Sequence, residues 1–141
     1  MPSHLDVYGF ERWKIAFDCT IEIACNWKTS VDAFNEAYHL ASVHPQLLQM
    51  LDETRVEIEL YGQHSVIRVP FGVPSPNGAA RETVNDLLKY LLREAGIDPG
   101  SFRGPASSVR GAIQRALRAR GDLDLSRLTD DQITDNHQYH V

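Results

Sequence analysis

Alternating apolar and polar positions predict the strands of this chain. In residues 14–25, apolar side chains occupy every second position, and Lys14, Asp18, Thr20 and Glu22 stand on the opposite face. The same period of two recurs in residues 55–61, and Gly62 and Gln63 separate that segment from its expected partner strand in residues 64–70. Glycine accepts the positive φ that a two-residue hairpin turn requires. We therefore predict a long half-buried strand first and an antiparallel hairpin later in the chain.

Two longer segments have the apolar spacing of amphipathic helices. Apolar side chains repeat every three or four positions in residues 81–95 and again from about Ser107 to Gly121, as in a helix with one buried face. Gly96 stands where the first of these helices should stop, because glycine readily takes the left-handed conformation that follows helix C-termini. With the strands, the pattern indicates an α+β fold with an antiparallel sheet and about four helices.

Shorter signals complete the predicted order of elements. Pro45 is expected to start a short helix whose inward side chains are Leu47, Leu48 and Leu51. Residues 71–78 contain two prolines and two glycines, so we predict a surface loop there. Thr129 has the side chain of an N-cap and should open another short helix, and residues 135–141 should begin a further strand.

Composition narrows the class of protein. The chain has 141 residues, enough for one domain, and a net charge of -5, which argues against nucleic acid as the main partner. No apolar run approaches the length of a membrane span and the N-terminus lacks a signal-peptide pattern, so we expect a cytoplasmic location. Cys19 and Cys25 share one face of the first predicted strand. They would lie about 20 Å apart, too far for a disulfide, and we expect both to be buried.

The stretch from Asn26 to Pro45 carries the candidate chemistry. Thr29 and Asp32 have the spacing of a capping box, so a helix is predicted to begin there, with Asp32 as a cap rather than a ligand. Glu36 and His39 are three residues apart and would share a helix face. His39 and His44 are five apart, which on an ideal helix separates them by about 140°. Both can reach one metal only if the helix distorts or ends between them, as Pro45 allows.

These residues resemble the iron-binding segment of a known enzyme family. Asn26-Trp27-Lys28, then Phe34-x-Glu36-x-Tyr38-His39, then His44-Pro45, is similar to the catalytic domain of Rieske non-haem iron oxygenases. These are the alpha subunits of aromatic ring-hydroxylating dioxygenases and related monooxygenases. The resemblance implies that His39 and His44 are ligands of a mononuclear Fe(II). It also implies that Glu36 stands behind them, accepting a hydrogen bond from a ligating histidine and carrying a path for electron transfer.

The resemblance covers only part of the family's catalytic domain. The family fold is a helix-grip (Bet v 1-like) domain, and residues 1–141 correspond to the first half of it, as a single partial catalytic domain. In the family the third iron ligand is an Asp well over a hundred residues beyond the second His, whereas Val141 lies 97 residues beyond His44. The CxH and CxxH pairs that hold the family's Rieske [2Fe-2S] cluster are also missing. We expect this chain to be inactive alone.

The family reaction sets the expected partners. It uses dioxygen and electrons relayed from NAD(P)H by a reductase, often through a ferredoxin, to hydroxylate an aromatic or other apolar substrate in aromatic hydrocarbon catabolism. The family forms homo-oligomers, typically trimers. With half the sheet missing, we expect this chain to expose apolar surface and to oligomerise or be poorly soluble.

Other functions remain open at this point. The scaffold could be a non-catalytic domain that binds apolar ligands, or the histidines could form an unrelated zinc site completed by His137, His140 or Asp32. Residues 107–121 also carry four arginines, which form either a solvated helix face or a docking patch for an acidic partner such as a ferredoxin. They are Arg110, Arg115, Arg118 and Arg120.

Overall fold

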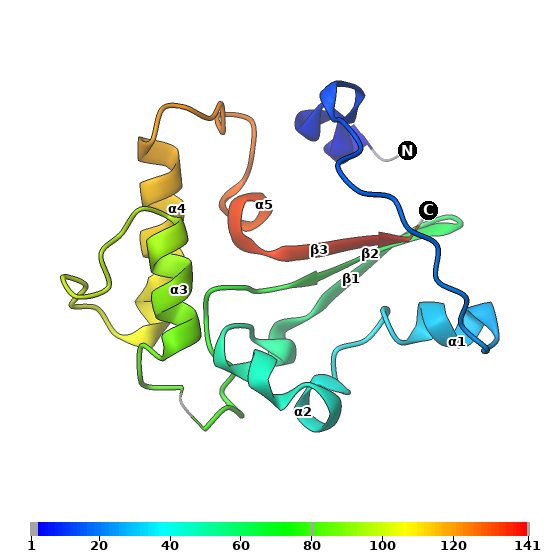
Figure 1. Cartoon of the computed structure of the whole chain (residues 1–141), viewed down its shortest axis with the longest axis horizontal. Coiled ribbons are helices and arrows are strands. Elements are labelled where there is room, and N and C mark those ends of the chain that lie inside the picture. Colours follow the sequence, from blue (N-terminus) through cyan, green and yellow to red (C-terminus); the bar gives the residue numbers. More distant parts are fainter. Residues whose placement is uncertain (1–2, 80, 141) are drawn as a thin grey trace.

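A three-stranded antiparallel sheet forms the centre of the fold. The structure, a computed structural model, describes residues 3–79 and 81–140. Strands β1 (Glu57–Tyr61), β2 (His64–Val69) and β3 (Asn136–His140) lie in the order β1-β2-β3, as Figure 1 shows. The predicted hairpin is confirmed, with Gly62 at φ 65° in its turn. The predicted C-terminal strand is confirmed as β3, so the α+β class with an antiparallel sheet is correct.

One face of this sheet carries the core that positions the candidate site. The face is built from cross-strand neighbours, in which Ile67 of β2 stands opposite Ile58 of β1 and Gln138 of β3. Against it pack helix α2 (Leu40–Val43) and the 3-10 helix Pro45–Gln49 that Pro45 begins. The buried side chains of this cluster are Ala37, Leu40, Leu48, Leu51, Ile67 and Val69. The leucines after Pro45 therefore face inward, as the sequence predicts.

A second apolar cluster holds two helices together beside the sheet. Helix α3 (Asp86–Glu94) starts at Asn85, whose side chain accepts a hydrogen bond from the Leu88 backbone N–H at 3.0 Å, and it is followed by Gly96 at φ 79°. It packs on α4 (Val109–Ala119) through side chains that include Leu88, Leu92, Val109 and Ile113. Both helices are confirmed; α3 starts later than predicted, and α4 starts directly after its N-cap residue Ser108.

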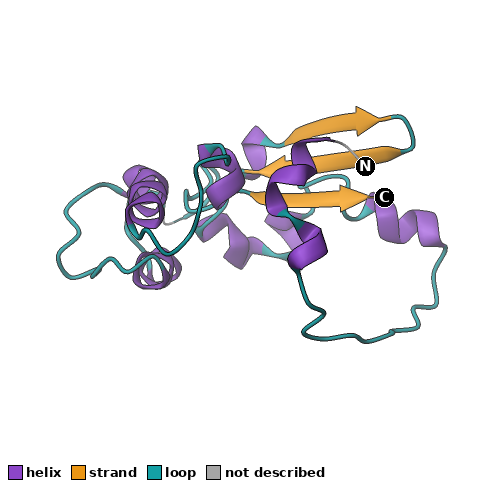
Figure 2. Ribbon diagram, turned by 90° about the horizontal axis from the view of Figure 1, so that it is seen from above, coloured by secondary structure: helices purple, strands orange, loops and turns teal. Residues whose placement is uncertain are grey.

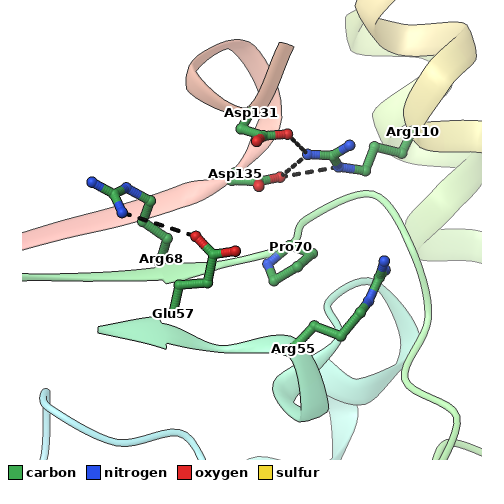
Figure 3. A pocket seen from close by; sticks show the side chains of 7 residues that line it. All are labelled: Arg55, Glu57, Arg68, Pro70, Arg110, Asp131 and Asp135. Atoms are coloured by element: carbon green, nitrogen blue, oxygen red, sulfur yellow. Dashed lines mark hydrogen bonds and ion pairs between the residues drawn. The ribbon is translucent and has the colours of Figure 1, made fainter. Parts of the chain in front are cut away.

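Helix α5 connects this pair to the sheet. It spans Asp130–Thr134 and begins in a capping box between Thr129 and Gln132, which confirms Thr129 as its N-cap. Arg110 of α4 reaches Asp131 at 2.7 Å and Asp135 at 2.8 Å, and Figure 3 shows the guanidinium lying between these carboxylates. Ion pairs thus fix α5, and the strand β3 that follows it, against α4.

The loop after β2 is irregular, as predicted, but it is not superficial. Phe71 forms an isolated bridge with Leu51, and the Ser75 side chain is completely buried. The Ser75 backbone N–H donates to the Leu48 carbonyl at 2.8 Å. The loop therefore covers the edge of the core instead of lying on the surface.

The predicted strand at residues 14–25 is wrong. This segment is extended but pairs with no strand among the described residues, and it arcs away from the body of the molecule in Figure 2. Ile15, Phe17 and Ile21 are 87%, 81% and 75% exposed. Cys19 and Cys25 are exposed free thiols rather than buried residues. Alternation gives a segment two faces, but a strand forms only where another strand supplies hydrogen bonds.

The helices outnumber the prediction because several are short. The described residues contain five α-helices, including α1 (Trp27–Asp32), and further 3-10 helices at Ser3–Tyr8, Phe10–Arg12, Glu53–Arg55 and Ala106–Ser108. None of the helices within residues 3–79 and 81–140 combines the length and apolar character needed to cross a membrane.

Candidate metal centre

The histidine-bearing stretch folds as two short helices rather than one long one. Helix α1 starts one turn earlier than predicted, because the Asn26 side chain accepts a hydrogen bond from the Lys28 backbone N–H at 2.9 Å. Asp32 is its last residue, so the predicted capping box at Thr29 and Asp32 is wrong. Asn26 precedes Thr29 and also has the side chain of a good N-cap. The chain then leaves helical geometry before Glu36.

His39 and His44 flank helix α2. His39 is its N-cap residue and His44 its C-cap residue, with φ -128° and ψ 51°. The following Pro45 disfavours helical geometry at His44, so the helix ends between the two histidines, as a shared metal requires. Their ring centroids lie 5.6 Å apart, with ring planes at 77°. Since a metal–nitrogen bond of about 2.1 Å puts each ring centre roughly 3 Å from the ion, this spacing fits one shared ion.

Glu36 fixes the tautomer of the His39 ring. One carboxylate oxygen is hydrogen-bonded to His39 Nδ1, and the other accepts from the His39 backbone N–H at 3.1 Å. Because an ionised carboxylate can only accept hydrogen bonds, the ring N–H stands on Nδ1 and leaves the lone pair on Nε2 for a metal. Burial raises the pKa of Glu36, but these two hydrogen bonds outweigh it, and the pKa lies below its usual value.

A cleft opens beside the two imidazoles. Its volume is about 210 Å³, and one wall carries Glu36, His39 and His44. The opposite wall is the sheet, where Ile67 and Val69 of β2 and the carboxamides of Asn136 and Gln138 of β3 line the cleft. Sequence reasoning did not identify these two carboxamides. The available signal was that residues 136, 138 and 140 are all polar, which gives β3 one entirely polar face.

The other proposed ligands do not join this pair. Within the described part of the chain, no group of three His, Cys, Asp or Glu side chains is arranged to hold a metal ion. His137 lies on the opposite face of β3 from Gln138, and His140 is hydrogen-bonded to Ser65. Asp32 ends α1. The structure therefore brings together two imidazoles and one supporting carboxylate, and it does not assemble the ligand set of a closed zinc site.

Phe34 and Tyr38 differ from the core role that their spacing suggests. Their side chains are 54% and 81% exposed. The i,i+4 relationship between them requires a helix, and residues 33–38 are not helical. Neither aromatic ring therefore belongs to the core in this fold.

The charged cavity of Figure 3 is not an anion-binding site. It measures about 180 Å³ and is lined by three arginines and three acids around Pro70. Arg110 binds Asp131 and Asp135, and Arg68 lies 3.9 Å from Glu57. Arg55 binds Asp52 at 2.7 Å. The charged side chains that line the cavity are therefore balanced by ion pairs within the chain.

Most of the arginines in and directly after α4 also form ion pairs within the chain. Besides Arg110, Arg118 binds Asp130 at 2.8 Å and two backbone carbonyls, and Arg120 binds Asp122 at 2.7 Å. Arg115 is exposed. These pairs oppose the interpretation of α4 as a docking patch for an acidic partner, since most of its positive charge is neutralised by neighbouring carboxylates.

Comparison with known proteins identifies the family of this chain. Residues 10–100 match the family described as the ring hydroxylating alpha subunit (catalytic domain). The chain belongs to this family. That match covers Glu36, His39 and His44, whereas β3 lies beyond it. The family uses mononuclear iron, and the paired imidazoles are consistent with such a centre.

The relatives are much longer than the shared segment. The glycine betaine monooxygenase oxygenase subunits of Pseudomonas aeruginosa strains UCBPP-PA14 and PAO1 are each 38% identical to this chain over 53 residues. The aligned segment spans 38% of this chain and 12% of each relative. No solved structure matches.

Proposed function

We propose that this chain forms part of the iron site of a ring-hydroxylating oxygenase alpha subunit. His39 and His44 are the two imidazole ligands of Fe(II), and a carboxylate outside these 141 residues completes a two-histidine, one-carboxylate centre. Such a centre leaves positions open for dioxygen. The observation that carries the proposal is the pair of imidazoles 5.6 Å apart at the two caps of the short helix α2, with Glu36 hydrogen-bonded to the first.

The chain's own residues hold and orient the metal ligands. Glu36 keeps the His39 proton on Nδ1, so that Nε2 is available. The buried side chains of Leu40, Leu48 and Leu51 anchor α2 against the sheet and set the spacing of the two rings. Ile67 and Val69 supply an apolar wall that limits water in the cleft. When bound, the iron supplies activation of dioxygen; electrons come from a Rieske cluster and reductase outside this chain.

The finer features of the fold belong to the same proposal. We infer that residues 1–141 form a partial helix-grip domain that functions within a homo-oligomer, together with the cluster-bearing domain. The open edge of β1 supports this, because Ile58 and Leu60 on the cleft-bearing face are 53% and 76% exposed. Apolar side chains on a sheet face are normally buried against another part of the protein or against a partner.

Two substrate classes compete for the cleft. The family favours an aromatic or other apolar substrate. The carboxamides of Asn136 and Gln138 favour a second candidate, a small polar substrate such as the glycine betaine in the relatives' name, since amide N–H groups can donate to a carboxylate. Calorimetric titration of the metal-loaded chain with glycine betaine and, separately, with indole distinguishes the two classes.

Anaerobic metal titration tests the metal proposal. The chain is titrated with Fe(II), and with Co(II) as a spectroscopic probe, alongside His39→Ala and His44→Ala. We expect weak binding by the wild-type chain and loss of binding in both variants. His64→Ala, on the β1–β2 hairpin, is the matched histidine control and should bind as wild type does. The proposal is overturned if the wild-type chain binds neither ion, or if His39→Ala changes nothing.

A further inference from the structure

A chain of polar side chains ties the Glu36 segment to the sheet. The Ser65 hydroxyl on β2 lies 3.3 Å from the Asn35 side-chain oxygen, thirty positions earlier in the sequence. The same hydroxyl lies 3.1 Å from His140 Nδ1 on β3. All three residues are half-buried. The contact therefore joins both strands beside the cleft to the residue that immediately precedes Glu36.

The donors and acceptors of this chain have one consistent direction. The Asn35 oxygen accepts only, so the single proton of the Ser65 hydroxyl is donated to it. His140 Nδ1 must then be the donor to the Ser65 oxygen. Ser65 and His140 are also cross-strand partners in the β2–β3 register. The backbone pairing of the two strands therefore keeps the hydroxyl next to the His140 ring.

The segment that carries Glu36 has little regular structure of its own. Residues 33–38, between α1 and α2, form turns and irregular backbone, and Ala37 is their buried side chain, in the same apolar cluster as Ile67 and Val69. Packing of the small Ala37 methyl group restrains movement of this segment along the sheet only weakly, whereas a hydrogen bond is directional and holds the segment in one position. The position of Glu36 and His39 relative to the sheet wall thus depends on Asn35 as well as on packing.

We propose that Ser65, acting through Asn35, is a positioning residue for the metal site. This inference rests on the proposed function. Loss of the hydroxyl leaves the Glu36–His39 hydrogen bond intact, because that contact is local. It frees the segment to shift against the sheet, so the His39 ring departs from the spacing to His44 that a shared ion needs. We expect roughly tenfold weaker metal binding, the lower end of the effect of outer groups.

The test is a Co(II) titration of variants of the 141-residue chain, followed by absorption spectra. Ser65→Ala and Asn35→Ala should each bind roughly tenfold more weakly and show altered Co(II) absorption bands. Ser65→Thr, which keeps a hydroxyl, should bind close to wild type. The double variant should be no weaker than either single variant, since both remove the same bond. Ser101→Ala is the matched control, because its hydroxyl also donates a hydrogen bond, to the Asp98 carbonyl at 2.9 Å, on an exposed turn.

The outcomes separate this inference from the proposed function. Wild-type affinity and spectrum in both folded alanine variants overturn the positioning role while leaving His39 and His44 as ligands. Additive losses in the double variant also overturn it, since independent effects cannot come from one shared bond. If Ser65→Ala fails to fold by circular dichroism, Asn35→Ala, in the connecting turns, decides the question. A wild-type chain that binds no Co(II) or Fe(II) overturns both proposals.

Discussion

The Nδ1 nitrogen of His39 is hydrogen-bonded to the carboxylate of Glu36, three residues earlier in the chain. The same carboxylate also accepts the His39 backbone N–H. Both contacts lie in the segment where α1 has ended and α2 begins. One side chain therefore sets both the backbone entry to α2 and the tautomer of the first candidate ligand.

Removal of the Glu36 carboxylate should weaken metal binding without removing a ligand. We expect Glu36→Ala to lower Co(II) affinity by about 10- to 100-fold, the usual effect of losing the partner of a ligating histidine. Glu36→Gln keeps an oxygen acceptor and should lose less. Isothermal titration measures both, with Glu82→Gln on the exposed turn before α3 as the charge-matched control. Equal affinities in Glu36→Ala and wild type would exclude this role.

The elements that sequence predicted correctly depend on neighbours along the chain. The hairpin needs Gly62 in its turn, and helix α5 needs a capping box whose two members are three residues apart. The end of α2 follows from Pro45, which acts on His44 alone. Glu36, His39 and His44 lie within nine positions of one another, so a local pattern was sufficient to find them.

The elements that sequence missed depend on distant partners. Residues 14–25 alternate, but the strand they would form requires a neighbouring strand that nothing in the local pattern supplies. The bond between Ser65 and Asn35 joins positions thirty apart, and the pair Arg110–Asp135 joins positions 25 apart. In each case the tertiary packing of segments distant in the sequence decides the contact, and the local pattern around either residue does not reveal it.

Asp52 should make folding stability sensitive to acid. Its side chain is 8% exposed and caps the short helix Glu53–Arg55. Burial raises the pKa of Asp52, but hydrogen bonds from the Thr54 hydroxyl, Arg55 and the Thr54 backbone N–H outweigh it, so the pKa is lowered. A carboxyl with a lowered folded-state pKa stabilises the fold above its unfolded pKa of about 3.9. That contribution is lost as the pH falls through the folded-state pKa.

The measurement for Asp52 is urea unfolding of wild type and Asp52→Asn at pH 7 and at successively lower pH. We expect the variant to be less stable by about 1–3 kcal/mol at pH 7 and the difference to shrink below about pH 4. Asp18→Asn, in the exposed segment, should match wild type at each pH. A difference between Asp52→Asn and wild type that stays constant down to pH 2 would contradict this assignment.

The exposed apolar segment should drive self-association. Ile15, Phe17 and Ile21 share the apolar side of the alternating segment and have most of their surface in water, and the edge strand β1 also exposes Leu60. We expect the wild-type chain to associate increasingly with concentration in sedimentation velocity runs. Replacing these three residues by Thr, Ser and Thr should shift the chain toward monomer. Thr20→Ser in the same segment is the control; a wild-type chain that stays monomeric at all concentrations contradicts the prediction.

Arg110 should stabilise the fold through its ion pairs. Its guanidinium is 22% exposed and binds Asp131 and Asp135, which join α4 to the start of β3. Arg110→Ala leaves the largely buried Asp135 carboxylate, 7% exposed, without its cation, so we expect a loss of about 1–3 kcal/mol in the free energy of unfolding. Arg115→Ala, on the same helix with an exposed side chain, should change stability by less than about 0.5 kcal/mol. Urea unfolding of both variants measures the contrast. Equal stabilities would mean that the ion pairs of Arg110 do not hold β3 in place, and the polar wall of the cleft would then need another support.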